Sequence, residues 1–197
     1  MLKEKLKNHR LILASGSPRR QEFFKNLGLD FEIQLKPITE EYPPRLKHFE
    51  ISNYLSQLKA LPYKEALQPK DILITSDTIV WHNNTALGKP RDIKEAFSIL
   101  KSLSNATHEV ITSVCFTTTT YTKTLYSITK VSFKDLTDDE INYYIKNYQP
   151  FDKAGAYGIQ EWIGQIGVTK IEGSYFNVMG LPVHLVYKTL NTIAETT

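Results

Sequence analysis

The sequence predicts a single compact α/β domain, and three observations support this prediction. The chain has 197 residues, of which 41% are hydrophobic and 23% are charged, the proportions of an ordinary globular protein. Segments with the apolar pattern of β-strands alternate with segments of helical period, an order typical of α/β folds. Neither an internal repeat nor a low-complexity linker divides the chain. We therefore expect one domain over residues 1–197, with a core at about residues 10–191, built as one unit or as two lobes around a cleft.

The charge and the cysteine content limit the classes of binding partner and the cellular compartment that we expect for the protein. The 24 Lys and Arg residues are nearly balanced by 21 Asp and Glu residues, and the basic residues are dispersed, so we expect no stable nucleic-acid partner. The single cysteine, Cys115, excludes an intramolecular disulfide and a zinc site with several thiolates. No stretch approaches the roughly 18 apolar residues of a spanning helix, so we expect no membrane partner. These features predict a soluble, cytoplasmic protein.

The first third of the chain predicts a strand, a loop and a helix, followed by a second strand and helix. Leu11–Ala14 is an apolar run that ends at Ser15-Gly16-Ser17-Pro18, a cluster typical of a turn that starts a helix. Its proline fits the first helical position and its second serine the N-cap, and Gly28 ends the helix. We expect the next strand at Phe31–Leu35 and, after a proline-containing connection, a helix over Phe49–Leu61.

The middle of the chain predicts a buried strand, a helix and a β-hairpin. Ile72–Trp81 is apolar and β-branched apart from a short polar interruption, and Asn83-Asn84 supplies a turn after it. Helical spacing of apolar residues predicts a helix over Asp92–Leu103. The hairpin consists of two strands and the turn between them, which are Glu109–Phe116, Thr124–Phe133 and Tyr121–Lys123.

The last third predicts two helices separated by a glycine-rich segment. Thr137-Asp138-Asp139-Glu140 has the pattern of a capping box, and the helix that it starts ends before Pro150. Glycine is frequent between Asp152 and Gly180, so we expect loops and short strands there rather than helix. A closing helix is expected from Leu181 or Pro182 to Leu190.

The segment Ser15-Gly16-Ser17-Pro18-Arg19-Arg20 is the first candidate for ligand binding. A glycine-containing turn that leads into a helix presents free N–H groups and the positive end of the helix dipole, which bind anions. The hydroxyls of Ser15 and Ser17 are further donors, and the guanidinium groups of Arg19 and Arg20 match phosphate oxygens. The alternative is a capped surface helix whose arginines form salt bridges, because the segment is not a Walker sequence.

Asp77 is the second candidate, because it lies in an otherwise apolar strand. Burying an unpaired carboxylate is costly, so Asp77 must be paired, bind a metal, or lie at a strand end that faces a cleft. The alternative is a strand-end acid that caps a turn. Lys89 follows in Gly88-Lys89-Pro90, where the proline restricts the backbone, although a solvated lysine is the usual explanation for such a sequence.

Four further features are individually weak. Lys59 ends a helix, and Glu41 lies beside Glu40 in an irregular connection. We interpret His108 as a structural histidine, because no nucleophile motif accompanies it. The segment Asp152–Gln160 combines an acid, a base, glycines and a terminal amide, and the amide offers the donor and acceptor that read the edge of a planar base. The alternative is a glycine-rich turn.

Taken in order, these motifs resemble the Maf family of nucleoside triphosphate pyrophosphatases over nearly the whole chain. The matching segments are Leu13–Arg20, Glu41, Lys59-Ala60, Asp77-Thr78-Ile79-Val80, Gly88-Lys89-Pro90, His108 with Thr112, Asp152–Gln160 and Gly180-Leu181-Pro182. The segment Asp152–Gln160 resembles the subgroup that acts on dTTP and UTP rather than the one that acts on methylated GTP. Trp81 and Glu161-Trp162 depart from the family pattern, and these departures bear on the shape of the pocket.

The resemblance implies hydrolysis between the α- and β-phosphates, assisted by a divalent cation, either Mg²⁺ or, as alternatives, Mn²⁺ or Co²⁺. The implied catalytic residues are Asp77, Lys59 and Lys89, the implied metal ligands are Glu41 and Asp77, and the implied substrate-binding residues are Ser15, Ser17, Arg19, Arg20, Thr78 and Gln160. The family associates positions such as Thr78 and Gln160 with base choice. The implied fold is a mixed, elongated central sheet flanked by helices, in two lobes around a cleft, similar to the Ham1-like inosine triphosphatases. A homodimer is also implied.

We therefore expect an enzyme that hydrolyses dTTP, UTP and modified pyrimidine nucleotides, and so clears the nucleotide pool. Two alternatives stay open. One is a nucleotide-binding regulator of cell division without significant turnover, and the other is a pyrophosphatase for inosine or xanthosine triphosphate. Pyrophosphate release with magnesium separates an enzyme from a binding protein, and a panel of nucleotides separates the substrates.

Overall fold

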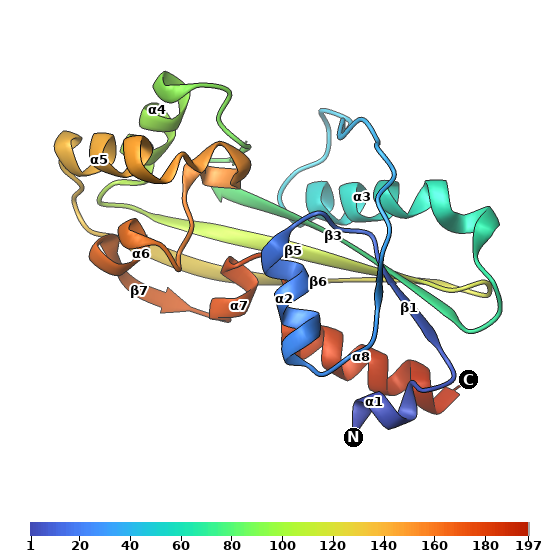
Figure 1. The fold of residues 1–197 in the computed structure, drawn as a ribbon. Helices are drawn as coiled ribbons and strands as arrows, with labels where there is room; N and C mark the ends of the chain where they lie inside the picture. Colours follow the sequence, from blue (N-terminus) through green and yellow to red (C-terminus); the bar gives the residue numbers. More distant parts are fainter. Residues whose placement is uncertain (197) are drawn as a thin grey trace. The chain divides into compact units, whose positions relative to one another are not determined.

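The computed structural model describes residues 1–196, which form a mixed seven-stranded sheet flanked by helices (Figure 1). The strands are β1 (Arg10–Leu13), β2 (Glu32–Ile33), β3 (Asp71–His82), β4 (Thr85–Leu87), β5 (Thr107–Thr117), β6 (Thr122–Phe133) and β7 (Val168–Glu172). Their order is β2-β1-β3-β5-β6-β7, and β4 pairs with β3. β1 pairs in parallel with β2 and β3, whereas the pairs β3–β4 and β6–β7 are antiparallel. The predicted mixed α/β sheet is confirmed.

Helices connect and flank the strands. The α-helices are α1 (Leu2–Lys5), α2 (Pro18–Asn26), α3 (Phe49–Ala60), α4 (Ile93–Leu103), α5 (Asp138–Tyr148), α6 (Trp162–Gly167), α7 (Tyr175–Val178) and α8 (Val183–Thr196), and short 3-10 helices lie at Leu61–Ala66, Pro150–Asp152 and Ala154–Ala156. The capping box predicted for α5 is confirmed, because Glu140 N donates to Thr137 Oγ1 and Thr137 N donates to Glu140 Oε2. Over residues 1–196, the helices are too short or too polar to cross a membrane.

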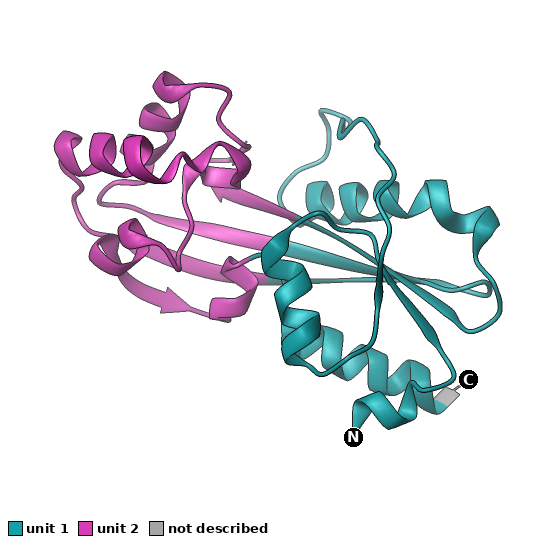
Figure 2. Cartoon of the chain, viewed as in Figure 1, with its two compact units in different colours: residues 1–77, 112–127, 180–197 teal, residues 78–111, 128–179 magenta. Residues whose placement is uncertain are grey.

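The chain forms two compact units (Figure 2). Unit 1 comprises Met1–Asp77, Thr112–Ser127 and the chain from Gly180 onward, and unit 2 comprises Thr78–Ile111 and Ile128–Met179. These units match the two lobes expected from the sequence. Because the boundary falls inside β3, the adjacent candidate residues Asp77 and Thr78 belong to different units.

In unit 1, the parallel strands β1 and β3 supply the core. Ile12 and Leu73 are register partners and pack, with Cys115, against Ala60 and Tyr63. α3 and α8 lie on opposite sides of β1 (Figure 1). Since both faces of these strands are covered, Leu11–Leu13 and Ile72–Ile74 are continuous apolar runs rather than alternating patterns.

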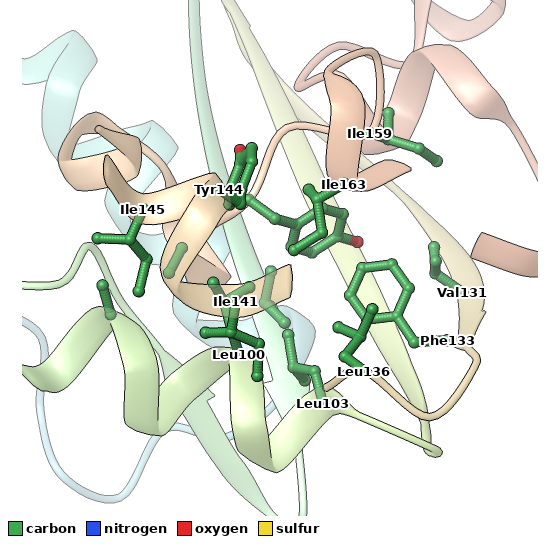
Figure 3. Close-up of a cluster of buried hydrophobic side chains, with 14 of the residues drawn as sticks. Leu100, Leu103, Val131, Phe133, Leu136, Ile141, Tyr144, Ile145, Ile159 and Ile163 are labelled. Atoms are coloured by element: carbon green, nitrogen blue, oxygen red, sulfur yellow. The ribbon is translucent and has the colours of Figure 1, made fainter. Parts of the chain in front are cut away.

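Unit 2 has its own core (Figure 3). α4 and α5 pack against each other, and Leu100 and Leu103 of α4 contact the apolar face of α5. That face consists of Ile141, Tyr144 and Ile145, all buried, at helical spacing. This packing fixes the position of the Tyr144 hydroxyl, which contributes to the candidate site.

Two predictions of local structure are wrong. The segment Asp152–Gly180 contains α6, α7 and 3-10 turns in addition to β7, rather than loops and short strands. Gly164 shows why glycine content was misleading, because a Cβ there would collide with the Ile159 carbonyl oxygen, so this glycine allows close backbone approach inside a helix. The hairpin turn predicted at Tyr121–Lys123 lies earlier, because Thr118 N donates to the Tyr121 carbonyl oxygen at 2.9 Å.

Other boundaries differ in length. β2 covers Glu32–Ile33 rather than Phe31–Leu35, and the closing helix α8 runs to Thr196. The predicted turn at Asn83-Asn84 is confirmed, with φ values of 48° and 59°. The short strand β4 that follows this turn was not predicted.

Candidate active site

The loop between β1 and α2 contains the first predicted ligand-binding residues. Ser17 occupies the N-cap position of α2, and Pro18 is the first helical residue, as predicted. The Ser17 side chain makes no capping hydrogen bond. The backbone N–H of Ser17 donates instead to Oγ of the buried Ser15 at 3.3 Å. Gln21 Nε2 donates to the Ser15 carbonyl oxygen at 3.1 Å. Ser15 therefore fixes the loop, and the Ser17 hydroxyl does not occupy the first N–H groups of α2.

Arg20 connects α2 to two other segments of unit 1. Its Nε donates to the Gly180 carbonyl oxygen and its Nη1 to the Ser76 carbonyl oxygen, both at 2.8 Å. Burial lowers the pKa of the Arg20 guanidinium and the Asp77 carboxylate raises it, and the group stays cationic because the ordinary arginine pKa is far above neutrality. Arg20 thus holds a fixed positive charge near Asp77. Its direct contact with substrate stays a prediction, as does that of the half-buried Arg19.

Asp77 lies within β3 and is paired. Only 5% of the residue is exposed, and its Oδ1 accepts a hydrogen bond from Lys59 Nζ at 2.7 Å. Burial raises the pKa of the Asp77 carboxyl, whereas the Lys59 ammonium and the Arg20 guanidinium lower it. Of the alternatives for a buried strand acid, the structure therefore shows the paired one, and Asp77 does not cap a turn.

Lys59 reaches Asp77 because α3 is tied to β3. Thr75 Oγ1 donates to the Ser56 carbonyl oxygen at 2.6 Å, and both residues are fully buried. Thr75 shares a strand face with Asp77, and Ser56 lies almost one helical turn before Lys59, so this bond sets the register between the acid and the base. Lys59 Nζ also contacts Glu40 Oε1 at 3.2 Å.

The acids around Lys59 fit a divalent cation. Mg²⁺ prefers oxygen ligands, and one or two carboxylates suffice where substrate phosphates and waters complete the shell. Asp77 and Glu40 supply two carboxylates that contact the same ammonium group. Over residues 1–196, no three or more His, Cys, Asp or Glu side chains are grouped so that they could hold a metal ion among themselves. Glu41 is exposed and its role as a ligand stays a prediction, whereas its neighbour Glu40, which the sequence did not distinguish from it, is the acid that contacts Lys59.

In unit 2, one glycine joins the segments that carry the predicted residues. Thr78 is half-buried in β3, and Lys89 is exposed in Gly88-Lys89-Pro90. Gly155 N donates to the Gly88 carbonyl oxygen at 3.1 Å. Gly155 has a φ of 72°, and a Cβ there would lie 2.6 Å from Val80 Cγ2. Only glycine allows this backbone and this packing, which bring the segment Asp152–Gln160 against β3.

Tyr144 of α5 anchors the end of that segment. Its hydroxyl oxygen accepts a hydrogen bond from Gly158 N at 3.0 Å, and the hydroxyl donates to Glu161 Oε2. Burial and the hydrogen bond to Glu161 raise the pKa of the Tyr144 hydroxyl, so it stays protonated and remains a donor. Glu161 Oε1 also lies 3.2 Å from the ammonium of the buried Lys153. The sequence indicates this network only through the segment Asp152–Gln160 and through Glu161 as a departure from the family pattern, and it does not single out Tyr144.

His108 is buried in the core of unit 2. Its Nε2 lies 2.7 Å from the Tyr157 hydroxyl, and its ring makes edge contacts with Tyr157 and Phe133. Burial lowers the pKa of His108 to about 3, so the imidazole is neutral at physiological pH. These contacts support the structural interpretation of His108.

The fold is that of an α/β protein, and each of its two units carries residues of the predicted site. Unit 1 holds Asp77, Lys59 and Arg20 together near the start of α2, and unit 2 presents Lys89 and Gln160 on segments joined through Gly155. The chain belongs to the Maf-like protein family, which matches residues 10–193. The resemblance drawn from the motifs is confirmed.

Similar proteins are known by name and by structure. A Flavobacterium johnsoniae protein called dTTP/UTP pyrophosphatase is 63% identical over 98% of this chain and 100% of its own length. A Flavobacterium psychrophilum protein of the same name is 58% identical over 95% of this chain and 96% of its own length. The solved structure of the Staphylococcus aureus Ham1 protein is 16% identical and aligns with a TM-score of 0.53, covering 93% of this chain and 99% of that one. This likeness confirms the Ham1-like fold.

Proposed function

We propose that the chain is a metal-dependent nucleoside triphosphate pyrophosphatase that converts dTTP and UTP to the nucleoside monophosphate and pyrophosphate. Relatives called dTTP/UTP pyrophosphatase match it over nearly its whole length, which supports this substrate class. The observation that carries the chemistry is the buried pair of Asp77 and Lys59. The proposal includes modified pyrimidine nucleotides as substrates and a role in clearing them from the nucleotide pool.

Asp77 is the general base of the proposed reaction. It accepts a proton from the water that attacks the α-phosphorus, while the bond from this phosphorus to the bridging oxygen breaks and pyrophosphate leaves. A carboxylate whose pKa is raised by burial is a stronger base than an exposed aspartate. The 2.7 Å contact with Lys59 orients the carboxylate and favours its ionised form.

The remaining residues bind and orient the nucleotide. The Ser15–Ser17 loop and the N–H groups at the start of α2 bind phosphate oxygens, assisted by Arg19 and Lys89. Asp77 and Glu40 would hold the divalent cation, which supplies neutralisation of phosphate charge. Gln160 and Thr78 select the base.

The test is pyrophosphate release from dTTP, UTP, CTP, ITP and XTP, with Mg²⁺ and with a chelator. We expect release from dTTP and UTP that needs the metal and is lost in Asp77→Asn. Asp71→Asn is the matched control, because Asp71 is a second buried carboxylate of β3, paired with Arg10 at 2.6 Å. Equally slow release by wild type and Asp77→Asn would refute the enzyme and favour a nucleotide-binding regulator. A preference for ITP or XTP would show that the substrates are inosine or xanthosine triphosphate rather than dTTP and UTP.

Assembly and location are separate proposals. A homodimer without stable nucleic-acid or membrane partners and a cytoplasmic location are expected from the sequence and the resemblance. Sedimentation of the purified chain tests the homodimer, and fractionation of cells tests the location. A monomer in sedimentation would remove the homodimer from the proposal without affecting the reaction.

A further inference from the structure

Unit 2 contains a buried ion pair that the proposed reaction does not use. Lys153 is 8% exposed, and its ammonium lies 2.7 Å from Asp152 Oδ1 and 3.2 Å from Glu161 Oε1. The other carboxylate oxygen of Glu161 accepts the hydrogen bond from the Tyr144 hydroxyl. Buried charges of this kind are costly unless they are paired and hydrogen-bonded. Both carboxylate oxygens of Glu161 are therefore engaged, and the carboxylate has one defined position.

The Glu161 carboxylate lies beside the Gln160 amide. A methyl group at Gly158 would lie 2.7 Å from Glu161 Cδ, 2.9 Å from Glu161 Oε1 and 3.0 Å from Gln160 Nε2. The two neighbouring side chains thus fold back over the same α-carbon. Gln160 Nε2 and Glu161 Oε1 both lie within 3.0 Å of that methyl position, so the NH₂ group is on the same side of Gly158 as the carboxylate.

The orientation of a glutamine amide is easily reversed, because its terminal torsion is broad and nearly two-fold. A fixed carboxylate attracts the NH₂ group and repels the carbonyl oxygen, so it favours one of the two orientations. With Gln160 Nε2 on the side of Glu161, the amide oxygen is left for the ligand. An oxygen acceptor suits the N3–H group of uracil or thymine, whereas the N3 atom of cytosine has no hydrogen to donate.

We propose that Glu161, held by Lys153 and Tyr144, is a positioning residue that orients the Gln160 amide and thereby sets the preference for uracil and thymine over cytosine. The inference rests on the proposed function, since it needs a substrate whose base meets Gln160. It explains a position where the family pattern has small residues. It also gives the buried Lys153 a role, because Lys153 keeps the Glu161 carboxylate in place.

The test compares kcat and KM for UTP and CTP in wild type, Glu161→Ala and Glu161→Gln. We expect the ratio of kcat/KM for UTP over CTP to fall about tenfold in Glu161→Ala, the size of effect that one mispaired hydrogen bond produces. The change should lie in KM, with kcat for UTP within about twofold of wild type, because Glu161 touches no reacting atom. Glu161→Gln keeps the size and the bond from Tyr144 but removes the charge, so it should also lower the ratio, by less.

The controls separate positioning from folding. Glu172→Gln removes a carboxylate paired with Lys170 on the exposed strand β7, and it should leave the ratio unchanged. Binding of the non-hydrolysable α,β-imido analogues of UTP and CTP, measured by calorimetry, should show the same loss of preference. If Glu161→Ala does not fold, Glu161→Gln alone decides.

An unchanged ratio in a folded Glu161 variant, or an equal loss for both nucleotides, overturns the inference. Failure of wild type to cleave UTP instead overturns the proposed function, so the two failures are distinguishable.

Discussion

Gly155→Ala tests how unit 2 holds the segment Asp152–Gln160 against β3. The φ of 72° at Gly155 disfavours any residue with a Cβ, and this costs about 1–2 kcal/mol. The added methyl would also lie 2.6 Å from Val80 Cγ2 and 3.1 Å from Val80 Cβ, and overpacking of this kind costs about 1–3 kcal/mol. The free energy of unfolding should therefore fall by about 2–5 kcal/mol, a large part of the about 5–15 kcal/mol typical of a domain.

Urea denaturation measures this loss. The fluorescence of Trp81 and Trp162, both in unit 2, reports unfolding near the substitution, and circular dichroism reports the whole chain. Gly28→Ala is the matched control, because Gly28 has a similar φ of 66° and no atom within 4 Å of an added Cβ. Gly28→Ala should cost only the backbone contribution of about 1–2 kcal/mol.

A second substitution isolates the collision. Val80→Ala removes both γ-carbons, which would lie 2.6 and 3.2 Å from the new methyl, and keeps Cβ, so Gly155→Ala should cost at least about 1 kcal/mol less in that background. Equal costs of Gly155→Ala in both backgrounds would refute the packing argument. A cost no larger than that of Gly28→Ala would do the same.

Three further predictions concern charged groups. Asp77→Asn should lower the rate of pyrophosphate release by about 10²–10³-fold without lowering the thermal midpoint, because burial disfavours the charge of the Asp77 carboxylate. Asp71→Asn should lower the thermal midpoint and keep the activity, because Arg10 loses its partner. Thermal scans paired with activity assays check both variants. Burial raises the pKa of Asp77, so the acid limb of the pH profile of kcat/KM should lie above pH 3.8. Glu40→Gln should move this limb to lower pH, because the negative charge of Glu40 raises the pKa of Asp77 and is removed. A shift to higher pH would contradict the assignment of this limb to Asp77. In the folded chain His108 stays neutral down to about pH 3, whereas in the unfolded chain it takes up a proton near pH 6.5. The free energy of unfolding should therefore fall with decreasing pH between these values, by about 1.4 kcal/mol per pH unit. Urea midpoints of His108→Gln should lack this part of the pH dependence.

Elements with strong local patterns were predictable. β3 was recognised from its apolar run and α5 from its capping box, because the physical cause of each lies within the segment itself. The glycine-rich segment after α5 was not predictable in this way. Gly164 serves close packing inside a helix and Gly155 serves packing on Val80, and neither contact is visible in the local sequence.

The candidate site was predictable in part for the same reason. An acid in a buried strand must have a partner, which singled out Asp77, but the partner itself comes from α3 through the bond between Thr75 and Ser56. Glu40 was not separated from its neighbour because the connecting loop has no regular pattern that shows which acid turns inward. Long-range contacts of this kind depend on the tertiary fold rather than on local sequence.

The central claim is that Asp77, oriented by Lys59, activates water for attack on the α-phosphorus of UTP. Phosphorus NMR of UTP hydrolysed in heavy-oxygen water tests it most directly, because the heavy oxygen shifts the signal of the phosphate that receives it. The account predicts the label in UMP, unlabelled pyrophosphate, and formation of labelled UMP that is slower by about 10²–10³ with Asp77→Asn. Label in pyrophosphate, or release of UDP and phosphate, would contradict it.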